Sequence, residues 1–214
     1  MIEAILDLLY PNVCGFCNKI SKNSLCKKCE IKFRQLTCTK RIVHKNKSYS
    51  EQFYLFQYNN EIREKIIQYK FQEKAYLYKT FAKMMINNEK ICRFLKSYDI
   101  IIPVPIYKKR ESERGYNQSE LIAKELSSQI KTLKLESNIL YKKTNNVPQN
   151  SLTKLQRIQN VKNIYGIKNI QKIHNKNIIL FDDIYTTGNT VAECSKLLKQ
   201  TEANKIGILT IAKD

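Results

Sequence analysis

Two adjacent carboxylates follow four apolar residues in the stretch Ile178-Ile-Leu-Phe-Asp-Asp-Ile-Tyr-Thr-Thr-Gly-Asn-Thr190. The apolar run is typical of a buried strand in a parallel sheet, and residues 191–200 after the Thr/Gly turn have a helical pattern. A turn that leads into a helix presents backbone N–H groups and the positive end of the helix dipole to an anion. The stretch therefore predicts an anion-binding turn at the carboxyl end of a strand, in an α/β fold.

The side chains of this stretch indicate what the anion carries. Asp182 and Asp183 suit a vicinal diol, because two acceptors face two hydroxyl groups. Thr186, Thr187 and Thr190 add hydroxyl donors around the turn, and Gly188 between them allows close approach or a positive φ. The ligand implied has a diol at one end and a phosphate at the other, as in ribose 5-phosphate. The alternative is an Asp-rich turn that only caps a helix.

The rest of the chain alternates between strand and helix patterns, which predicts βαβ units and a mostly parallel sheet flanked by helices. We expect a basic loop at residues 108–114, a capping box from Asn117 to Glu120, and a long loop or partly helical flap at 143–163. Strands are expected at 53–58, 100–105, 139–141, 177–181 and 206–212, and helices at 1–10, 60–69, 74–96, 118–130 and 191–200.

Four of the seven cysteines form the pattern Cys14-x2-Cys17-x8-Cys26-x2-Cys29. The N-terminus has acids where a signal peptide would be basic, so we expect reduced thiols. Two close cysteine pairs then predict a tetrahedral, closed and structural zinc site. A redox role for one pair is the alternative, and Cys38 and His44 are either spare ligands or ordinary packing residues.

The chain is strongly basic: its 214 residues include 38 Lys and Arg against 19 Asp and Glu, a net charge of +19. Such a charge favours a polyanionic partner, although general enrichment in Lys, Asn and Ile would also produce it. The distribution favours a partner, because residues 137–181 contain no acid. No apolar run approaches the roughly 20 residues of a membrane helix.

The thirteen residues from Ile178 to Thr190 resemble the signature of the type I phosphoribosyltransferase family at every position. The resemblance implies that the ligand is 5-phosphoribosyl 1-pyrophosphate (PRPP) with Mg²⁺. Asp182 and Asp183 would then hold the ribose hydroxyls, and the loop from Tyr185 to Thr190 the 5-phosphate. The implied reaction is displacement of pyrophosphate at the anomeric carbon by a nitrogen nucleophile.

Nearly the whole chain also resembles the ComF family of competence-associated proteins. The resemblance rests on the cysteine pairs, Lys70-Phe71, Ile102-Pro-Val-Pro105, Arg114-Gly-Tyr-Asn-Gln118, Pro148-Gln149, Leu152, Arg157, Asn160 and the PRPP loop. It implies that Val104 and Pro105 lie in the pyrophosphate loop, with Arg110 and Arg114 close behind it. Residues 143–163 would be a mobile loop over the site, with Lys143, Gln149 and Arg157 as contacts.

These observations predict three regions: an N-terminal zinc module at 1–45, a helical hood or connecting region at 46–97, and a PRPP-binding domain at 98–214. The residues expected in catalysis are Asp182, Asp183, Arg114 and Arg157. PRPP contacts are expected from Asp182, Asp183, Ile184, Tyr185, Thr186, Thr187, Gly188, Asn189, Thr190, Val104 and Pro105, and nucleic-acid contacts from Lys108, Lys109, Lys142, Lys143 and Lys154.

Two functions stay open at this stage. The first is a phosphoribosyltransferase-like protein of natural transformation that transfers phosphoribose to an unknown nitrogen acceptor. The second is a non-catalytic protein that handles single-stranded DNA, with PRPP only as a ligand or regulator. By resemblance we expect it in the cytoplasm or peripheral at the inner membrane, without a transmembrane segment, and with other DNA-uptake proteins as partners.

Overall fold

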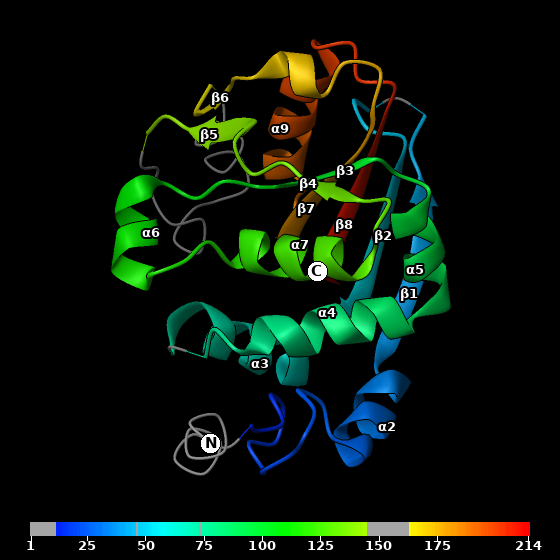
Figure 1. Ribbon diagram of the computed structural model, residues 1–214, viewed down its shortest axis with the longest axis vertical. Coiled ribbons are helices and arrows are strands. Elements are labelled where there is room, and N and C mark those ends of the chain that lie inside the picture. Colours follow the sequence, from blue (N-terminus) through cyan, green and yellow to red (C-terminus); the bar gives the residue numbers. More distant parts are fainter. Residues whose placement is uncertain (1–11, 46, 73, 145–162) are drawn as a thin grey trace.

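The structure, a computed structural model, describes residues 12–45, 47–72, 74–144 and 163–214 (Figure 1). Its main sheet has the strand order β1-β2-β8-β7-β3-β4, in which β1 is antiparallel to β2 and every other pair is parallel. A small hairpin pairs β5 with β6. The strands are β1 Thr37–Val43, β2 Glu51–Gln57, β3 Ile100–Pro103, β4 Lys134–Leu135, β5 Leu140–Lys142, β6 Tyr165–Ile167, β7 Asn177–Tyr185 and β8 Lys205–Lys213.

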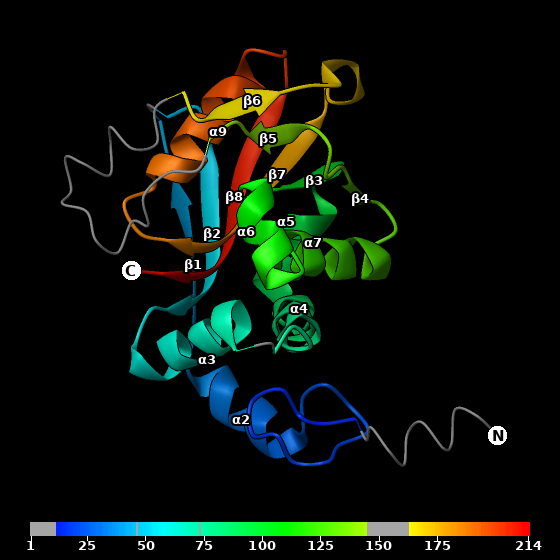
Figure 2. The same ribbon diagram turned by 90° about the vertical axis from the view of Figure 1, so that its left-hand side faces the viewer.

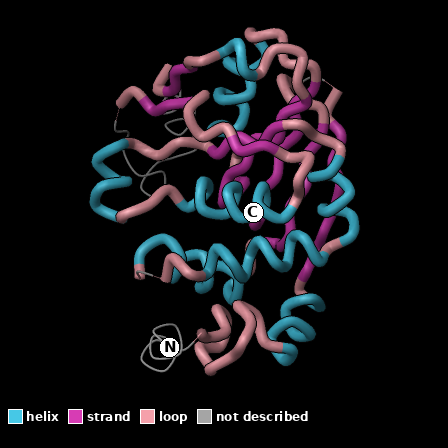
Figure 3. Tube along the Cα trace, viewed as in Figure 1, coloured by secondary structure: helices cyan, strands magenta, loops and turns pink. Residues whose placement is uncertain are grey.

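Helices cover both faces of the main sheet, which confirms the predicted fold class. Figure 2 shows α9 and the β5–β6 hairpin on one side and α4 and α7 on the other, and Figure 3 marks the helical segments along the trace. The helices are α2 Lys27–Gln35, α3 Asn60–Phe71, α4 Leu77–Asn87, α5 Glu89–Lys96, α6 Lys108–Arg114, α7 Gln118–Gln129 and α9 Asn189–Lys199, with a 3₁₀ turn at Ile170–Lys172.

The apolar run of β7 feeds two separate cores. Ile179 and Phe181 belong to the core shared with α3, α4, α5 and α7, whereas Ile178 and Leu180 belong to the core under α9 and the hairpin. Successive side chains of a strand point to opposite faces, so an unbroken apolar run is needed when both faces are covered. These two cores hold β7 rigidly at the centre of the sheet.

Two elements differ from the sequence expectation. The expected helix 74–96 is split into α4 and α5 at Asn88, whose backbone is extended and whose side chain accepts a hydrogen bond from the Ile91 N–H at 3.2 Å. Asparagine at this position starts a new helix because it satisfies a free N–H group. The expected basic loop 108–114 is the helix α6, which ends at Gly115 with φ 80°. Its Lys, Arg and Glu residues are good helix formers.

The sheet extends further toward the N-terminus than the motifs indicated. β1 lies inside the expected zinc module and β2 inside the expected connecting region, yet both belong to the main sheet, where β2 pairs with β8 and β1 with β2. The division of the chain at 45 and 97 stays a prediction. The expected helix 1–10 lies outside the described residues. In the part of the chain that the structure describes, no helix combines the length and apolarity of a membrane span.

Candidate functional site

The Thr/Gly turn joins β7 directly to α9. β7 is longer than predicted, because it continues through both carboxylates to Tyr185, where Asp182 pairs with Thr210 and Ile184 with Ala212 of β8. The chain then bends and α9 begins at Asn189, with Gly188 in the left-handed conformation at φ 77°. The site therefore stands at the carboxyl end of a central parallel strand, where ligands of α/β sheets bind.

Gly188 is required for two reasons. Its positive φ disfavours any residue with a side chain, and a Cβ at this position would lie 2.2 Å from the Tyr185 hydroxyl. The backbone of the turn therefore packs directly on the Tyr185 ring. This close packing fixes the first turn of α9, whose free N–H groups and dipole are suited to an anion.

The two carboxylates have different partners. Asp182 Oδ1 accepts a hydrogen bond from the Asp183 backbone N–H at 2.9 Å. Asp183 Oδ2 forms an ion pair with Lys70 Nζ at 2.7 Å, and the two side chains are 17% and 20% exposed. Lys70 belongs to the last turn of α3, so the connecting region contributes directly to this site. The sequence marked Lys70 only as part of a resemblance, and gave no signal for its pairing with Asp183.

Burial and the charge of Asp183 raise the pKa of Asp182 to about 7, against the opposing effect of Lys70 and Lys142. Burial and the charge of Arg110 lower the pKa of Lys142 to about 8, while Asp182 opposes this shift. Asp182 and Lys142 each affect the pKa of the other, so the β5–β6 hairpin, which carries Lys142, lies near the carboxylates. Lys142 is therefore half-buried beside the carboxylates rather than on an outer basic surface.

Arg114 also faces the carboxylates. Its guanidinium donates to Gln118 Oε1 at 2.5 Å and lies 4.9 Å from the centre of the Phe71 ring. Burial lowers the pKa of Arg114, and the charge of Asp183 opposes this shift. Arg114, Lys70 and Lys142 thus place cationic groups from three separate elements around one acidic pair.

Two buried amide donors lie on the elements of this site. Among the described residues, neither Gln118 Nε2 nor Asn189 Nδ2 has an acceptor. Leaving a buried donor unpaired costs roughly 1–3 kcal/mol. Asn189 is the first residue of α9 and Gln118 the first of α7, so both positions fit an anionic ligand with oxygen acceptors.

The Pro-Val-Pro segment lies next to β7. The Val104 N–H donates to the Phe181 carbonyl at 2.8 Å, and Asn117 Nδ2 donates to the Val104 carbonyl at 3.1 Å. Asn117 also caps α7 as predicted, because its Oδ1 accepts from the Ser119 N–H at 3.0 Å. Val104 and Pro105 therefore follow a strand adjacent to the one that carries the carboxylates.

The remaining expected contacts are divided between exposed and undescribed positions. Lys108, Lys109 and Lys143 are exposed. Gln149, Lys154 and Arg157 lie outside the described residues, as does most of the expected mobile loop.

The four predicted cysteines form one cluster. Their sulfur atoms all lie within 4.8 Å of one another, and Cys17 Sγ and Cys26 Sγ are 3.8 Å apart. Zinc–sulfur bonds of about 2.3 Å in a tetrahedron require sulfur separations of about 3.8 Å. Burial and the neighbouring thiols raise the pKa of Cys29, so full ionisation of the cluster needs a cation among the sulfurs. The donor set fits a structural metal.

The cysteine cluster is docked on the helical layer, away from the carboxylates. The Thr80 hydroxyl of α4 donates to the Ser24 carbonyl at 2.6 Å, and a Cβ at Gly15 would lie 2.3 Å from the same hydroxyl oxygen. Figure 1 shows α3 and α4 between this module and the sheet. Cys38 and His44 are not members of the cluster of described cysteines.

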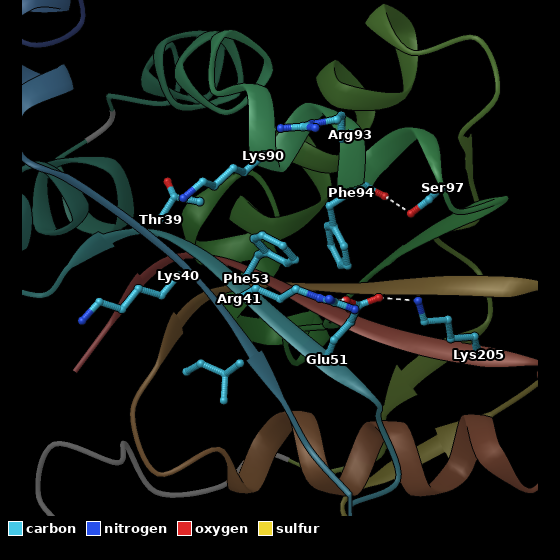
Figure 4. A pocket seen from close by; sticks show the side chains of 11 residues that line it. Thr39, Lys40, Arg41, Glu51, Phe53, Lys90, Arg93, Phe94, Ser97 and Lys205 are labelled. Atoms are coloured by element: carbon cyan, nitrogen blue, oxygen red, sulfur yellow. Dashed lines mark hydrogen bonds and ion pairs between the residues drawn. The ribbon is translucent and has the colours of Figure 1, made fainter.

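A groove of about 780 Å³ lies at the end of the sheet opposite the carboxylates (Figure 4). Glu51 and Lys205, which line it, begin β2 and β8, whereas the carboxylates stand near the end of β7. Burial alone would raise the pKa of Glu51, but hydrogen bonds from Lys205 and Arg41 lower it. The carboxylate of Glu51 is therefore neutralised by Arg41 and Lys205, and the groove is separate from the Asp182–Asp183 pair. Its lining comprises Thr39, Lys40, Arg41, Ile42, Glu51, Phe53, Lys90, Arg93, Phe94, Ser97 and Lys205.

Comparison with known proteins agrees with this geometry. A family model described as "Phosphoribosyl transferase domain" matches residues 117–214. Competence protein F of Haemophilus influenzae is 31% identical over 152 residues, which cover 69% of this chain and 66% of that protein, just under two thirds of its length. Competence protein ComFC of Bacillus subtilis is 28% identical over 216 residues, with 97% and 80% coverage. The DNA utilization protein YhgH of Escherichia coli K12 is 23% identical over 215 residues, with 97% and 93% coverage.

Among solved structures, the glutamine PRPP amidotransferase of B. subtilis matches with a TM-score of 0.41 and 16% identity, over 62% of this chain and 25% of that chain. A hypoxanthine phosphoribosyltransferase of Staphylococcus aureus matches with a TM-score of 0.39 and 13% identity, over 64% and 65% of the two chains.

Fold and site define a protein with a type I phosphoribosyltransferase domain and an N-terminal cysteine cluster that could bind a metal. Within that class, the chain is similar to competence protein F of H. influenzae and to competence protein ComFC of B. subtilis.

Proposed function

We propose that the protein binds PRPP with Mg²⁺ and transfers its phosphoribosyl group to a nitrogen acceptor. The observation that carries this proposal is the pair Asp182 and Asp183 at the end of β7, followed at once by an anion-binding turn. One ligand that carries a diol and a phosphate monoester satisfies both features. The two unpartnered donors, Gln118 Nε2 and Asn189 Nδ2, support an oxygen-rich occupant.

In the proposed complex, Asp182 and Asp183 accept hydrogen bonds from the ribose hydroxyls, and Lys70 keeps Asp183 in place. The residues from Ile184 to Thr190 hold the 5-phosphate with backbone N–H groups and hydroxyls. Val104 and Pro105 border the pyrophosphate, which Mg²⁺ accompanies as part of the substrate. Mg²⁺ keeps several waters and binds phosphate oxygens, so it needs few ligands from the chain.

In the proposed reaction the bond from the anomeric carbon to the pyrophosphate oxygen breaks, and its electron pair leaves with the pyrophosphate. A nitrogen lone pair forms the new bond to that carbon, and the nitrogen loses a proton. Negative charge grows on the leaving group, so fixed cations nearby lower the barrier. Arg114 and Lys142 are the described residues suited to this role, and Arg157 is a further candidate outside the described residues.

The metal of the cysteine cluster is proposed to be zinc. Four thiolates close its coordination shell, so it would hold the N-terminal module in shape and take no part in the transfer. The module packs on α4, and α3 next to it supplies Lys70. Loss of the metal is therefore expected to affect the anion site only indirectly, by disturbing these helices.

Binding and turnover are tested separately. Titration calorimetry with PRPP and Mg²⁺ should show one site per chain, and Asp182→Asn/Asp183→Asn should abolish it. Pyrophosphate release is then measured with free bases, nucleotides and single-stranded DNA as acceptors. Binding without release above background for any acceptor would overturn the transfer step and leave a PRPP-binding protein. Absence of binding would overturn the whole proposal.

A second candidate function is the handling of single-stranded DNA, supported by the net charge of +19 and by the relatives described as competence and DNA utilization proteins. On this proposal the protein acts during DNA uptake. Exposed cations such as Lys108 and Lys109 would contact phosphates, so binding should weaken with salt at a log–log slope of about −0.7 per contact. Fluorescence anisotropy of a thymidine oligonucleotide measures this slope. Lys108→Gln/Lys109→Gln should make the dependence on salt less steep. The control, Lys196→Gln/Lys199→Gln on α9, removes the same charge elsewhere.

A further inference from the structure

Residues 47–50, between β1 and β2, are docked against α9 and β8; the turn of residues 186–190, which would hold the 5-phosphate, is called the phosphate turn here. Ser48 Oγ lies 2.6 Å from Ser195 Oγ of α9, and the Ser50 N–H donates to the Ile206 carbonyl of β8 at 2.9 Å. These contacts join positions that are more than 140 residues apart in the chain. They fix residues 47–50 relative to the first turns of α9.

Three polar groups meet within this docked segment. Lys47 Nζ donates to Tyr49 Oη at 2.9 Å and to Tyr185 Oη at 3.1 Å, and the two phenol oxygens are 2.9 Å apart. Tyr49 is 1% exposed and Tyr185 7%. Burial and the neighbouring Tyr185 raise the pKa of Tyr49, so the phenol stays neutral and accepts from the ammonium group.

This cluster reaches the phosphate turn through one ring. The Tyr185 hydroxyl occupies the space where Gly188 would carry a Cβ. A shift of the ring would therefore move the backbone of the turn that begins α9. Lys47 Nζ donates to the same hydroxyl, so one phenol group separates its exposed positive charge from that turn.

We propose that Lys47, acting through Tyr49 and Tyr185, is a positioning residue for the phosphate monoester end of a sugar phosphate. It holds the Tyr185 ring against Gly188, so that the N–H groups of the turn converge on one point, and it adds positive charge behind them. This inference rests on the proposed PRPP site. It assigns part of the 5-phosphate subsite to residues far outside the Thr/Gly motif.

Two compounds that each correspond to one part of PRPP test this assignment. Ribose 5-phosphate occupies only the sugar and 5-phosphate part, whereas pyrophosphate with Mg²⁺ occupies only the leaving-group part. Titration calorimetry with each compound, and with PRPP, compares the wild type with Lys47→Met, Lys47→Arg and Tyr49→Phe. Lys45→Met is the matched control, because it removes the same charge from an exposed position in the same loop.

We expect Lys47→Met to weaken ribose 5-phosphate and PRPP by roughly tenfold each, since bonds from a charged donor are lost at the turn. Tyr49→Phe should weaken both by about 2- to 10-fold. Lys47→Arg should retain most of the affinity, because it keeps the charge and the donors. Pyrophosphate binding should stay within about twofold of wild type in every variant, and Lys45→Met should match wild type throughout.

Unchanged ribose 5-phosphate binding in Lys47→Met and Tyr49→Phe would overturn the inference while leaving the proposed function intact. Equal loss of pyrophosphate binding, or an equal effect of Lys45→Met, would also overturn it, because a general loss of charge or fold would then be the cause. Thermal unfolding of each variant identifies the latter. A wild type that binds neither ribose 5-phosphate nor PRPP would refute the proposed function itself, and this inference with it.

Discussion

The protonation of Asp182 couples the stability of the fold to pH. Burial and Asp183 raise its pKa from the ordinary 3.8 to about 7. The folded protein therefore holds this proton more tightly than the unfolded chain does. Between about pH 4 and 7 the unfolded chain releases this proton while the folded protein keeps it, so the free energy of unfolding falls as pH rises. Above about pH 7 the folded protein carries a buried carboxylate at a cost in free energy. Asp182→Asn removes the cost and should stabilise the protein above pH 7.

The size of the effect follows from the shift. About three pKa units correspond to about 4 kcal/mol at 1.36 kcal/mol per unit. Asp182 is only partly buried, and its titration is tied to Asp183 and Lys142, so about 2 kcal/mol is the expected gain. For a chain of this size, this gain raises Tm by about 4–8 °C. Asparagine keeps the oxygen that accepts from the Asp183 N–H, so no hydrogen bond is lost.

Urea unfolding of wild type and Asp182→Asn at pH 4 and pH 8 measures this prediction. The variant should exceed wild type by about 2 kcal/mol at pH 8 and by much less at pH 4. Asp183→Asn is the contrast, because it leaves Lys70 without its ion partner and should destabilise the protein. An Asp182→Asn variant no more stable than wild type at pH 8, or equally more stable at both pH values, would refute the reasoning.

Three further predictions concern other parts of the site. Lys70→Met should lower the free energy of unfolding by about 1–2 kcal/mol, because it leaves the half-buried Asp183 without its ion partner. Arg93→Met breaks an exposed ion pair with Glu89 and should lower it by less than about 0.5 kcal/mol in the same urea titration. Equal losses would contradict the claim that burial makes the Lys70–Asp183 pair the stronger one. Gly188→Ala should lower the free energy of unfolding by about 2 kcal/mol or more, and Gly115→Ala by only about 1 kcal/mol. Both glycines have a positive φ, but only at Gly188 would a Cβ meet another group, the Tyr185 hydroxyl. Equal losses in urea unfolding would contradict this contact. Purified protein should contain one zinc by elemental analysis, lost in Cys17→Ser and kept in Cys92→Ser; zinc retained in Cys17→Ser would contradict the four-thiolate site.

The central strands and the phosphate turn could be predicted because their signals are local. β7 carries an unbroken apolar run, β8 is apolar from Ile206 to Ala212 except at Thr210, and the turn at Gly188 is formed by consecutive residues. The cysteine cluster was predictable for the same reason, since each pair belongs to one tight knuckle. β1 was missed because it is an edge strand without a buried residue, and its adjacent exposed charges Lys40 and Arg41 resemble ordinary basic surface.

The contacts at the candidate site that the sequence did not predict are all long-range. Lys70 meets Asp183 across more than 100 residues, and Lys47 meets Tyr185 across 138. Neither lysine differs from its many neighbours of the same type until the fold brings α3 and the segment before β2 to the carboxyl end of β7. Lys142 was predicted as a nucleic-acid contact because its neighbourhood lacks acids in the sequence. In the fold its acidic neighbour is Asp182, 40 positions away.

The most direct test of the account is thermal stabilisation by PRPP, with and without Mg²⁺, of wild type and of Asp182→Asn/Asp183→Asn. At about 100 times its Kd, a ligand adds roughly 2.7 kcal/mol, or about 5–10 °C in Tm for a chain of this size. The account predicts this shift for wild type and none for the double variant. No shift for the zinc-loaded wild type with PRPP and Mg²⁺, or an equal shift for both proteins, would contradict a PRPP site at the end of β7.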